Sequence, residues 1–193
     1  MSGNNIPLIA THDSATGEKG SGLISWLVTP FARTQCKTIK QQHDAGCTMF
    51  DIRVKQKGKE WRCAHGLWKT KQTVEEILFT INTFKDSYVC ITYEGVLKNE
   101  SEKAQFCGVV NHWKEMYPNI FWGPVAVKYG EKGIKVDWIN LMPADKWALA
   151  RQGFIPLDGN HWQTYIPIPW LWDKIYTTPH MFDNEVYTFV DFL

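Results

Sequence analysis

Four short apolar segments in the first half of the chain each end in ionisable residues, and this arrangement restricts the possible folds more than any other feature. The segments cover residues 6–10, 47–54, 61–64 and 88–93. Each has the length of a buried strand, and helical patterns separate most of them. Strands that alternate with helices predict right-handed βαβ units around a parallel sheet.

Three helices are predicted between and after these strands. The first covers 38–45 and ends at Gly46, a residue type suited to the left-handed helix cap. The second begins at a capping box formed by Thr73 and Glu76, which an apolar helical face follows. The third covers 99–117. We expect a flexible loop at 17–22 and further strands at 134–139, 153–157 and 186–192.

The length of the chain is that of one domain with a substantial core, and no repeat or linker divides its 193 residues. We therefore treat residues 1–193 as a single catalytic unit and expect a monomer. The net charge of +1 provides no basic surface of the kind that nucleic-acid-binding proteins use.

The N-terminal sequence and the cysteines predict a cytoplasmic protein or a peripheral membrane protein. The N-terminus lacks the basic and apolar regions of a signal peptide, and no apolar run reaches the roughly 20 residues that span a bilayer. The five cysteines are odd in number and show no CxxC spacing. They are expected to be reduced, buried thiols rather than zinc ligands.

The ionisable residues at the strand ends are the candidate active site. Parallel strands of a barrel end on one face, where active sites are assembled, and adjacent strands lie about 4.8 Å apart. These side chains could therefore converge on one pocket. In chain order, the residues at the five strand ends are His12, Asp13, Asp51, Arg53, His65, Glu94 and Asp191.

Two histidines and one arginine suit the cleavage of a phosphodiester by a neighbouring hydroxyl. One imidazole takes the proton of the attacking hydroxyl and the other supplies a proton to the leaving oxygen. A guanidinium matches two phosphoryl oxygens with its planar fork. Simpler explanations remain open, because a strand-end histidine is more often structural, and Asp51 and Arg53 could form a salt bridge at a barrel rim. We interpret the other histidines as surface or structural: His43, His112, His161 and His180.

These residues also carry a resemblance to a known family. The motifs are Thr11-His12-Asp13-Ser14, Gln35 before a helix that ends at Ala45-Gly46, Phe50-Asp51-Ile52-Arg53, His65-Gly66 before a capped helix, and Val190-Asp191-Phe192. In this order they resemble the X domain of phosphatidylinositol-specific phospholipase C, and its bacterial, metal-independent branch in particular. The resemblance implies an α/β fold, a distorted and compact (β/α) barrel of the TIM type.

The resemblance also implies roles for the histidines and their carboxylates. His12 would be the general base on the inositol 2-hydroxyl, supported by Asp191. His65 would be the general acid, supported by Asp13. A phosphatidylinositol-like phospholipid would yield a cyclic phosphodiester and diacylglycerol, which is the reaction of a phosphorus–oxygen lyase.

The remaining site residues follow from the same resemblance. Arg53 would stabilise the phosphoryl oxygens at the place where metal-dependent relatives hold calcium, so no metal or cofactor is expected. Asp51 would help hold the site together. Glu94 and Asp137 are expected to bind substrate, although Glu94 departs from the basic residue that bacterial members tend to have there.

Tryptophans near the predicted site suggest contact with a membrane. Trp26 follows the His12 loop, and Trp170 and Trp172 precede the last predicted strand. Indole rings favour the membrane interface, and the resemblance implies rim tryptophans in the same places. Alternatively, these side chains cap the core of a small barrel.

Two other functions remain open. A metal-assisted, glycerophosphodiesterase-like hydrolase on the same barrel would use Glu94, Asp51 and Asp13 as ligands, and a chelator would inhibit it. A catalytically silent lipid-binding module is the second alternative. The paired acid and base argue against it, since a binding protein needs neither.

Overall fold

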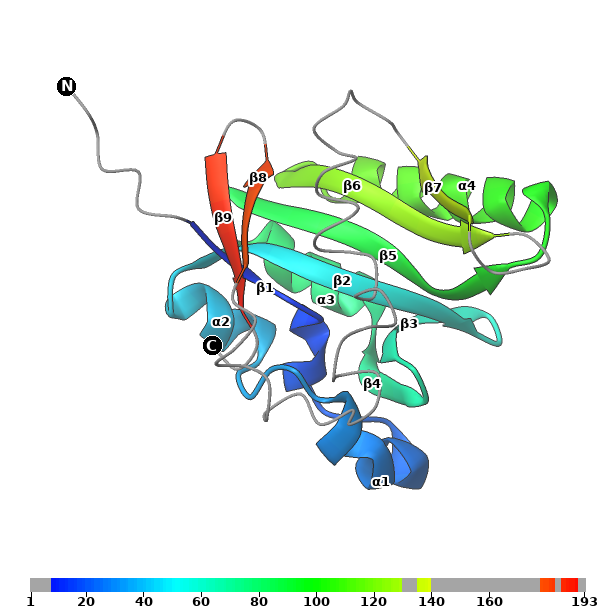
Figure 1. The fold of residues 1–193 in the computed structure, drawn as a ribbon, viewed down its shortest axis with the longest axis horizontal. Coiled ribbons are helices and arrows are strands. Elements are labelled where there is room, and N and C mark those ends of the chain that lie inside the picture. Colours follow the sequence, from blue (N-terminus) through cyan, green and yellow to red (C-terminus); the bar gives the residue numbers. More distant parts are fainter. Residues whose placement is uncertain (1–7, 130–134, 140–177, 183–184, 191–193) are drawn as a thin grey trace.

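The computed structural model describes residues 8–129, 135–139, 178–182 and 185–190. These residues form a mixed α/β structure in which one twisted sheet carries helices (Figure 1). The strands are β1 (Leu8–Thr11), β2 (Cys47–Lys57), β3 (Glu60–His65), β4 (Trp68–Thr73), β5 (Ser87–Leu97), β6 (Ile120–Tyr129), β7 (Lys135–Ile139), β8 (Thr178–Phe182) and β9 (Glu185–Val190). The helices are the 3-10 helix η1 (Ser14–Gly17) and the α-helices α1 (Gly22–Ala32), α2 (Ile39–Asp44), α3 (Val74–Asn82) and α4 (Glu100–Met116).

The sheet confirms the predicted α/β class, but the predicted closed barrel is not confirmed. Its strand order is β7-β6-β5-β2-β1-β9-β8. The central pairs of this order, from β6 to β9, are parallel, whereas β7 and β8 each pair antiparallel with their one neighbour. Within the described residues the sheet is therefore open, with β7 and β8 at its two ends (Figure 1).

The third predicted strand runs in the opposite direction from the one expected. β3 is antiparallel to β2, with Val54 paired to Cys63, and the two strands form a hairpin that turns at Gly58. A parallel connection needs a crossover of about a dozen residues, and the short segment between these strands cannot supply it. β4 extends the hairpin and was not predicted.

The predicted helices are confirmed with small changes of boundary. Capping boxes are present at the start of α2, where Thr38 pairs with Gln41, and at the start of α3, where Thr73 pairs with Glu76. Gly46 has a φ of 96°, as a glycine after a helix allows. The sequence analysis missed α1, β6 and β8.

The predicted loop at 17–22 is confirmed as a connection over residues 18–21, between η1 and α1, whereas its two end residues belong to these helices. Gly17 ends η1, and a Cβ at this position would lie 1.8 Å from the carbonyl oxygen of Lys37. Gly20 forms a bridge with Thr70 of β4, and α1 begins two residues later. Gly17 thus permits close approach to the backbone of Lys37, and Gly20 permits close approach to the side chains of Trp68 and Ser25.

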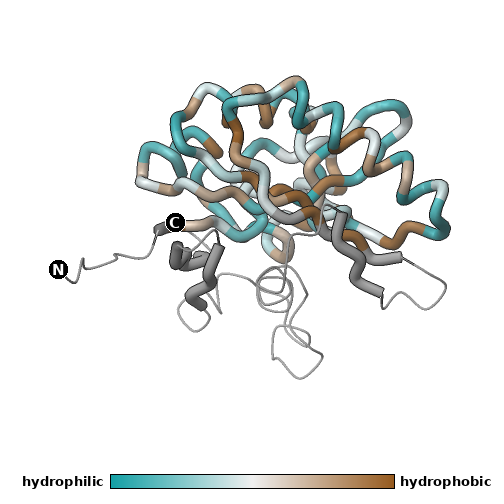
Figure 2. Tube along the Cα trace, turned by 90° about the horizontal axis from the view of Figure 1, so that it is seen from above, coloured by the Kyte–Doolittle hydropathy of each residue, from teal (hydrophilic) through white to brown (hydrophobic). Residues whose placement is uncertain are grey.

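The hydrophobic core lies between the sheet and helices α3 and α4. Side chains alternate along a strand, so Phe50, Ile52 and Val54 of β2 face this core. Asp51 and Arg53 consequently face the other side of the sheet. In Figure 2 the apolar stretches of the tube lie mainly in the interior, and the polar stretches lie on the outer turns.

Candidate active site

Five of the predicted site residues lie together beside the middle of the sheet. His12 and Asp13 follow β1, and the parallel pairing of Thr11 with Phe50 brings them beside Asp51 and Arg53 of β2. His65 reaches the same place because β3 runs back along β2. The structure thus brings this cluster together, although through a hairpin and not through four parallel strands.

Arg53 is the centre of the cluster. Its Nε lies 2.5 Å from Oδ1 of Asp13 and 3.4 Å from Oδ2 of Asp51. Its Nη2 lies 2.5 Å from Nε2 of His12. Burial alone would lower the pKa of the Arg53 guanidinium, but the negative charges of Asp13, Asp51 and Glu94 raise it well above its ordinary value. The side chain is therefore a permanent cation.

The carboxylate of Asp13 contacts Arg53 and both histidines of the cluster. Its Oδ2 lies 3.4 Å from Nδ1 of His65 and 3.7 Å from Nε2 of His12, while Oδ1 faces Arg53. Burial raises the pKa of Asp13, but the attraction of Arg53, His65 and His12 outweighs burial and leaves the pKa below its ordinary value. The backbone of Asp13 has a φ of 45°, a left-handed conformation that aspartate tolerates better than most residues.

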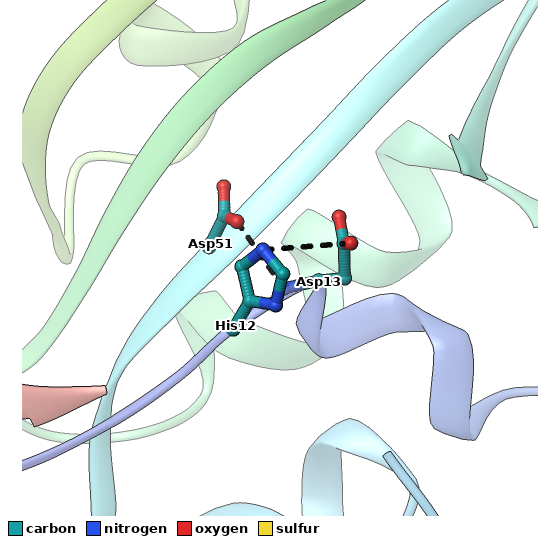
Figure 3. Close-up of side chains that lie close together, drawn as sticks. All are labelled: His12, Asp13 and Asp51. Atoms are coloured by element: carbon teal, nitrogen blue, oxygen red, sulfur yellow. Dashed lines mark hydrogen bonds and ion pairs between the residues drawn. The ribbon is translucent and has the colours of Figure 1, made fainter. Parts of the chain in front are cut away.

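The pKa of Asp51 is shifted in the opposite direction from that of Asp13. Its side chain is fully buried, and burial raises its pKa more than the neighbouring Arg53 lowers it. Oδ2 accepts a hydrogen bond of 3.2 Å from the backbone N–H of Asp13. No described residue donates a hydrogen bond to Oδ1. Figure 3 shows the ring of His12 beside both carboxylates.

The hydrogen bonds of the two histidines define their neutral tautomers. A carbonyl oxygen only accepts, so the 2.7 Å contact between Nδ1 of His65 and the carbonyl oxygen of Ala32 places a hydrogen on Nδ1. A guanidinium only donates, so the contact of Arg53 with Nε2 of His12 leaves the hydrogen of neutral His12 on Nδ1. In both rings Nε2 is the nitrogen that can exchange a proton.

The backbone of His12 is held by the segment that follows α1. Its carbonyl oxygen accepts hydrogen bonds from Oγ1 of Thr34 at 3.0 Å and from Nε2 of Gln35 at 3.1 Å. Both side chains are buried. Gln35 belongs to the recognised motif, whereas Thr34 and the Ala32 carbonyl were missed. Thr34 had no distinctive spacing, and a backbone carbonyl leaves no signal in residue identity.

Glu94 has a defined contact inside the protein. It lies within β5 rather than at its end, and its Oε1 accepts a 2.9 Å hydrogen bond from the backbone N–H of Gly66. Gly66 directly follows His65 and has a φ of 60°. Glu94 therefore holds the turn after the second histidine, and its role in binding substrate stays a prediction.

The other predicted residues are not part of the observed cluster. Asp137 lies in β7, where it pairs with Val127, and the strands β5 and β6 separate it from β2. Its role stays a prediction. Three predicted residues lie outside the described residues: Asp191, Trp170 and Trp172. The expected support of His12 by Asp191 requires the last strand to lie beside the first, and β9 is parallel to β1, with Val190 paired to Thr11.

Helix α1 presents an apolar surface close to the cluster. Trp26 is 70% exposed, which excludes the alternative that it caps the core. The exposed apolar side chains of α1 and of the turn between β3 and β4 are Leu23, Ile24, Trp26, Leu27, Phe31 and Leu67, which we call the α1 apolar surface. Among the described residues, no helix has the length and apolar character needed to cross a membrane.

Three residues of the cluster could in principle hold a metal ion. Ligand atoms of His12, Asp13 and Asp51 lie within 4.8 Å of one another. However, Arg53 contacts all three side chains. A cation between them would have to displace a guanidinium that is paired with both carboxylates, so these residues fit arginine better than a metal.

Comparisons with known proteins give weak matches only. No family model and no curated protein matches the chain. Among solved structures, phosphatidylinositol-specific phospholipase C from Listeria monocytogenes matches with 23% identity and a TM-score of 0.42, over 57% of this chain and 40% of that one. Two structures of the S. aureus phosphatidylinositol-specific phospholipase C match with 18% identity over 47% of this chain. Their TM-scores are 0.35 and 0.36, and the matches cover 31% and 30% of those chains.

Proposed function

We propose that this protein cleaves a phosphodiester by attack of a neighbouring hydroxyl, with two histidines as general base and general acid. The observation that supports the proposal is the contact of one buried carboxylate, Asp13, with Arg53, His12 and His65. This arrangement places one carboxylate in contact with both imidazoles and a permanent cation against the imidazole of His12. A substrate phosphate is attracted to that cation and would then lie within reach of both rings.

The reaction assigns one role to each side chain. A phosphoryl oxygen of the substrate accepts hydrogen bonds from the Arg53 guanidinium. The guanidinium then no longer donates to His12, and the Nε2 lone pair of His12 becomes free. The attacking hydroxyl gives its proton to that lone pair as its oxygen forms a bond to phosphorus. The bond between phosphorus and the leaving oxygen breaks, and Nε2 of protonated His65 supplies the proton that this oxygen needs.

The proposed substrate is a phosphatidylinositol-like phospholipid. Its inositol ring carries a hydroxyl next to the phosphodiester, which the reaction requires, so the products are a cyclic phosphodiester and diacylglycerol. The α1 apolar surface supports a lipid substrate, because contiguous exposed apolar side chains commonly mark membrane or protein contacts. The proposed location is therefore the cytoplasm or the surface of a membrane.

One assay tests the reaction type and the metal requirement together. Purified protein is incubated with phosphatidylinositol vesicles and an excess of chelator, and the products are followed by phosphorus NMR. We expect a cyclic phosphodiester signal that forms in the presence of chelator. A linear phosphate as the first product would refute attack by the neighbouring hydroxyl. Inhibition by the chelator would instead favour the metal-assisted hydrolase.

A further inference from the structure

The backbone of Asp13 has a conformation that its surroundings must hold in place. Its φ of 45° and ψ of 47° lie in the left-handed region, which a residue with a side chain adopts only under strain. Such strain persists where the surrounding structure fixes the residue firmly, and it is concentrated at functional sites. The carboxylate of Asp13 contacts Arg53 and both imidazoles, so the whole cluster depends on the direction in which this backbone points the side chain.

Thr16, a buried residue of η1, fixes the peptide group that follows Asp13. The carbonyl oxygen of Asp13 accepts a hydrogen bond of 2.9 Å from the backbone N–H of Thr16 and one of 2.8 Å from its hydroxyl. Oγ1 of Thr16 also accepts hydrogen bonds from the backbone N–H groups of Thr34 and Gln35, both at 3.1 Å. A hydroxyl offers one hydrogen and two lone pairs, and these bonds engage all three. The hydroxyl of Thr16 therefore ties the backbone of Asp13 to the segment that follows α1.

The peptide group that precedes Asp13 is held from the same place. Oγ1 of Thr16 lies 2.9 Å from Oγ1 of Thr34, whose hydroxyl donates to the carbonyl oxygen of His12 at 3.0 Å. The N–H of Asp13 donates to Oδ2 of Asp51 at 3.2 Å. Both peptide groups around the Cα of Asp13 are thus hydrogen-bonded to buried side chains. These bonds fix φ and ψ of Asp13, and with them the direction of its carboxylate.

We propose that Thr16 is a positioning residue, whose hydroxyl holds Asp13 in the left-handed conformation that lets one carboxylate contact both imidazoles. This inference rests on the proposed function and adds a residue to its machinery. The hydrogen bonds of Thr16 go to backbone groups and to the hydroxyl of Thr34, so Thr16 acts on the reaction through Asp13. Without the hydroxyl, Asp13 relaxes towards a less strained backbone, and its carboxylate turns away from the two rings.

Two variants of Thr16 test the proposal on a soluble, short-chain phosphatidylinositol. Thr16→Val keeps the shape of the side chain without its hydroxyl, whereas Thr16→Ser keeps the hydroxyl. We expect Thr16→Val to lower kcat about tenfold or more and to change KM less than about threefold, because small misplacements of a catalytic group are costly and Arg53 still attracts the phosphate. Thr16→Ser should retain most of the wild-type kcat. The control is Thr80→Val, which removes a hydroxyl bonded to the Glu76 carbonyl within α3 and should leave kcat unchanged.

A double-mutant cycle separates positioning from a general loss of structure. In the Asp13→Asn background, Thr16→Val should cause little further loss of kcat, because both changes act on the same carboxylate. Losses that multiply, equal losses in Thr16→Val and Thr16→Ser, or a wild-type kcat in Thr16→Val would overturn the proposal. If circular dichroism shows Thr16→Val to be unfolded, every comparison is made instead with Thr34→Val and Thr34→Ser. Thr34→Val is the milder change, because the His12 carbonyl keeps its hydrogen bond from Gln35.

A spectroscopic measurement makes the test independent of activity. In protein labelled with nitrogen-15 histidine, the imidazole signals of His12 and His65 should both shift in Thr16→Val and keep their wild-type positions in Thr16→Ser. The ring of His43, which stacks on Phe84, is the internal control and should not shift. If the wild type hydrolyses no substrate but both signals shift, the proposed function fails and the positioning of Asp13 stands. Signals of His12 and His65 that Thr16→Val leaves unchanged would refute the positioning, whatever the activity.

Discussion

Removing the charge of either buried aspartate of the cluster should change the stability of the protein, and the two changes should differ in sign or size. Asp13→Asn and Asp51→Asn are almost isosteric, and both keep an oxygen that can accept hydrogen bonds. Asparagine also tolerates the left-handed backbone of residue 13. The two variants therefore compare charge alone, at two positions that contact the same guanidinium.

The expected magnitudes follow from the contacts of each carboxylate. Asp13 touches Arg53 and both histidines, and removing one member of a buried ion pair costs about 3–5 kcal/mol in free energy of unfolding. Arg53 keeps Asp51 as a partner, so we expect a loss near the lower limit. At Asp51, burial disfavours the ionised carboxylate more than the attraction of Arg53 stabilises it. We expect Asp51→Asn to leave stability at neutral pH unchanged or to increase it.

The dependence on pH has opposite signs for the two residues. The pKa of Asp13 is lowered by folding, so its contribution is present above the unfolded pKa of about 3.9 and is lost as pH falls through the lower, folded value. The pKa of Asp51 is raised by folding. The stability that Asp51 contributes is present below the unfolded pKa and is lost as pH rises through the folded value. The free energy of unfolding of Asp51→Asn should therefore increase relative to that of the wild type as pH rises.

Urea unfolding measured across the range from acid to neutral pH tests both signs. The wild type should exceed Asp13→Asn at neutral pH and approach it in acid. A larger loss of stability in Asp51→Asn than in Asp13→Asn at neutral pH would refute the assignment of Asp13 as the main partner of Arg53. Circular dichroism of the folded variants controls for a change of structure.

The remaining predictions concern turnover and lipid binding. His65→Ala should lower turnover of phosphatidylinositol by at least about a hundredfold, and a loss below threefold would remove that histidine from the mechanism. His43→Ala, which alters a ring stacked on a phenylalanine, should leave turnover nearly unchanged. Arg53→Lys should retain little activity, because an ammonium cannot reproduce the planar fork, and near-normal turnover would contradict this role. Trp26→Ala should weaken sedimentation with vesicles more than it lowers hydrolysis of a soluble ester, and equal losses in the two measurements would contradict contact with a membrane. Glu94→Gln should retain most activity, because its amide oxygen can still accept the hydrogen bond from the N–H of Gly66. Glu94→Ala should lose activity because it removes this acceptor. Equal losses in the two variants would indicate that the negative charge of Glu94 acts on the substrate or on a bound cation.

Local sequence patterns predicted the helices α2, α3 and α4, although not α1, and the identity of the cluster residues. The capping box at Thr73 acts within four residues, so the start of α3 could be predicted without knowledge of its neighbours. The alternation along β2 likewise separates Phe50 and Ile52 from Asp51 and Arg53. Residue types suited to proton transfer at the ends of apolar segments identified His12 and His65.

Only the tertiary structure decided how these side chains meet. His65 reaches Asp13 because β3 turns back on β2, and strand direction depends on pairing with a neighbour rather than on the pattern of the strand itself. The contact of Glu94 with Gly66 joins β5 to the turn that follows β3, across 28 residues of sequence. The bond from His65 to the Ala32 carbonyl depends on where α1 ends in space, and any residue type supplies such a carbonyl. For this reason the sequence revealed which groups could carry the chemistry, whereas their orientation became visible only in the folded chain.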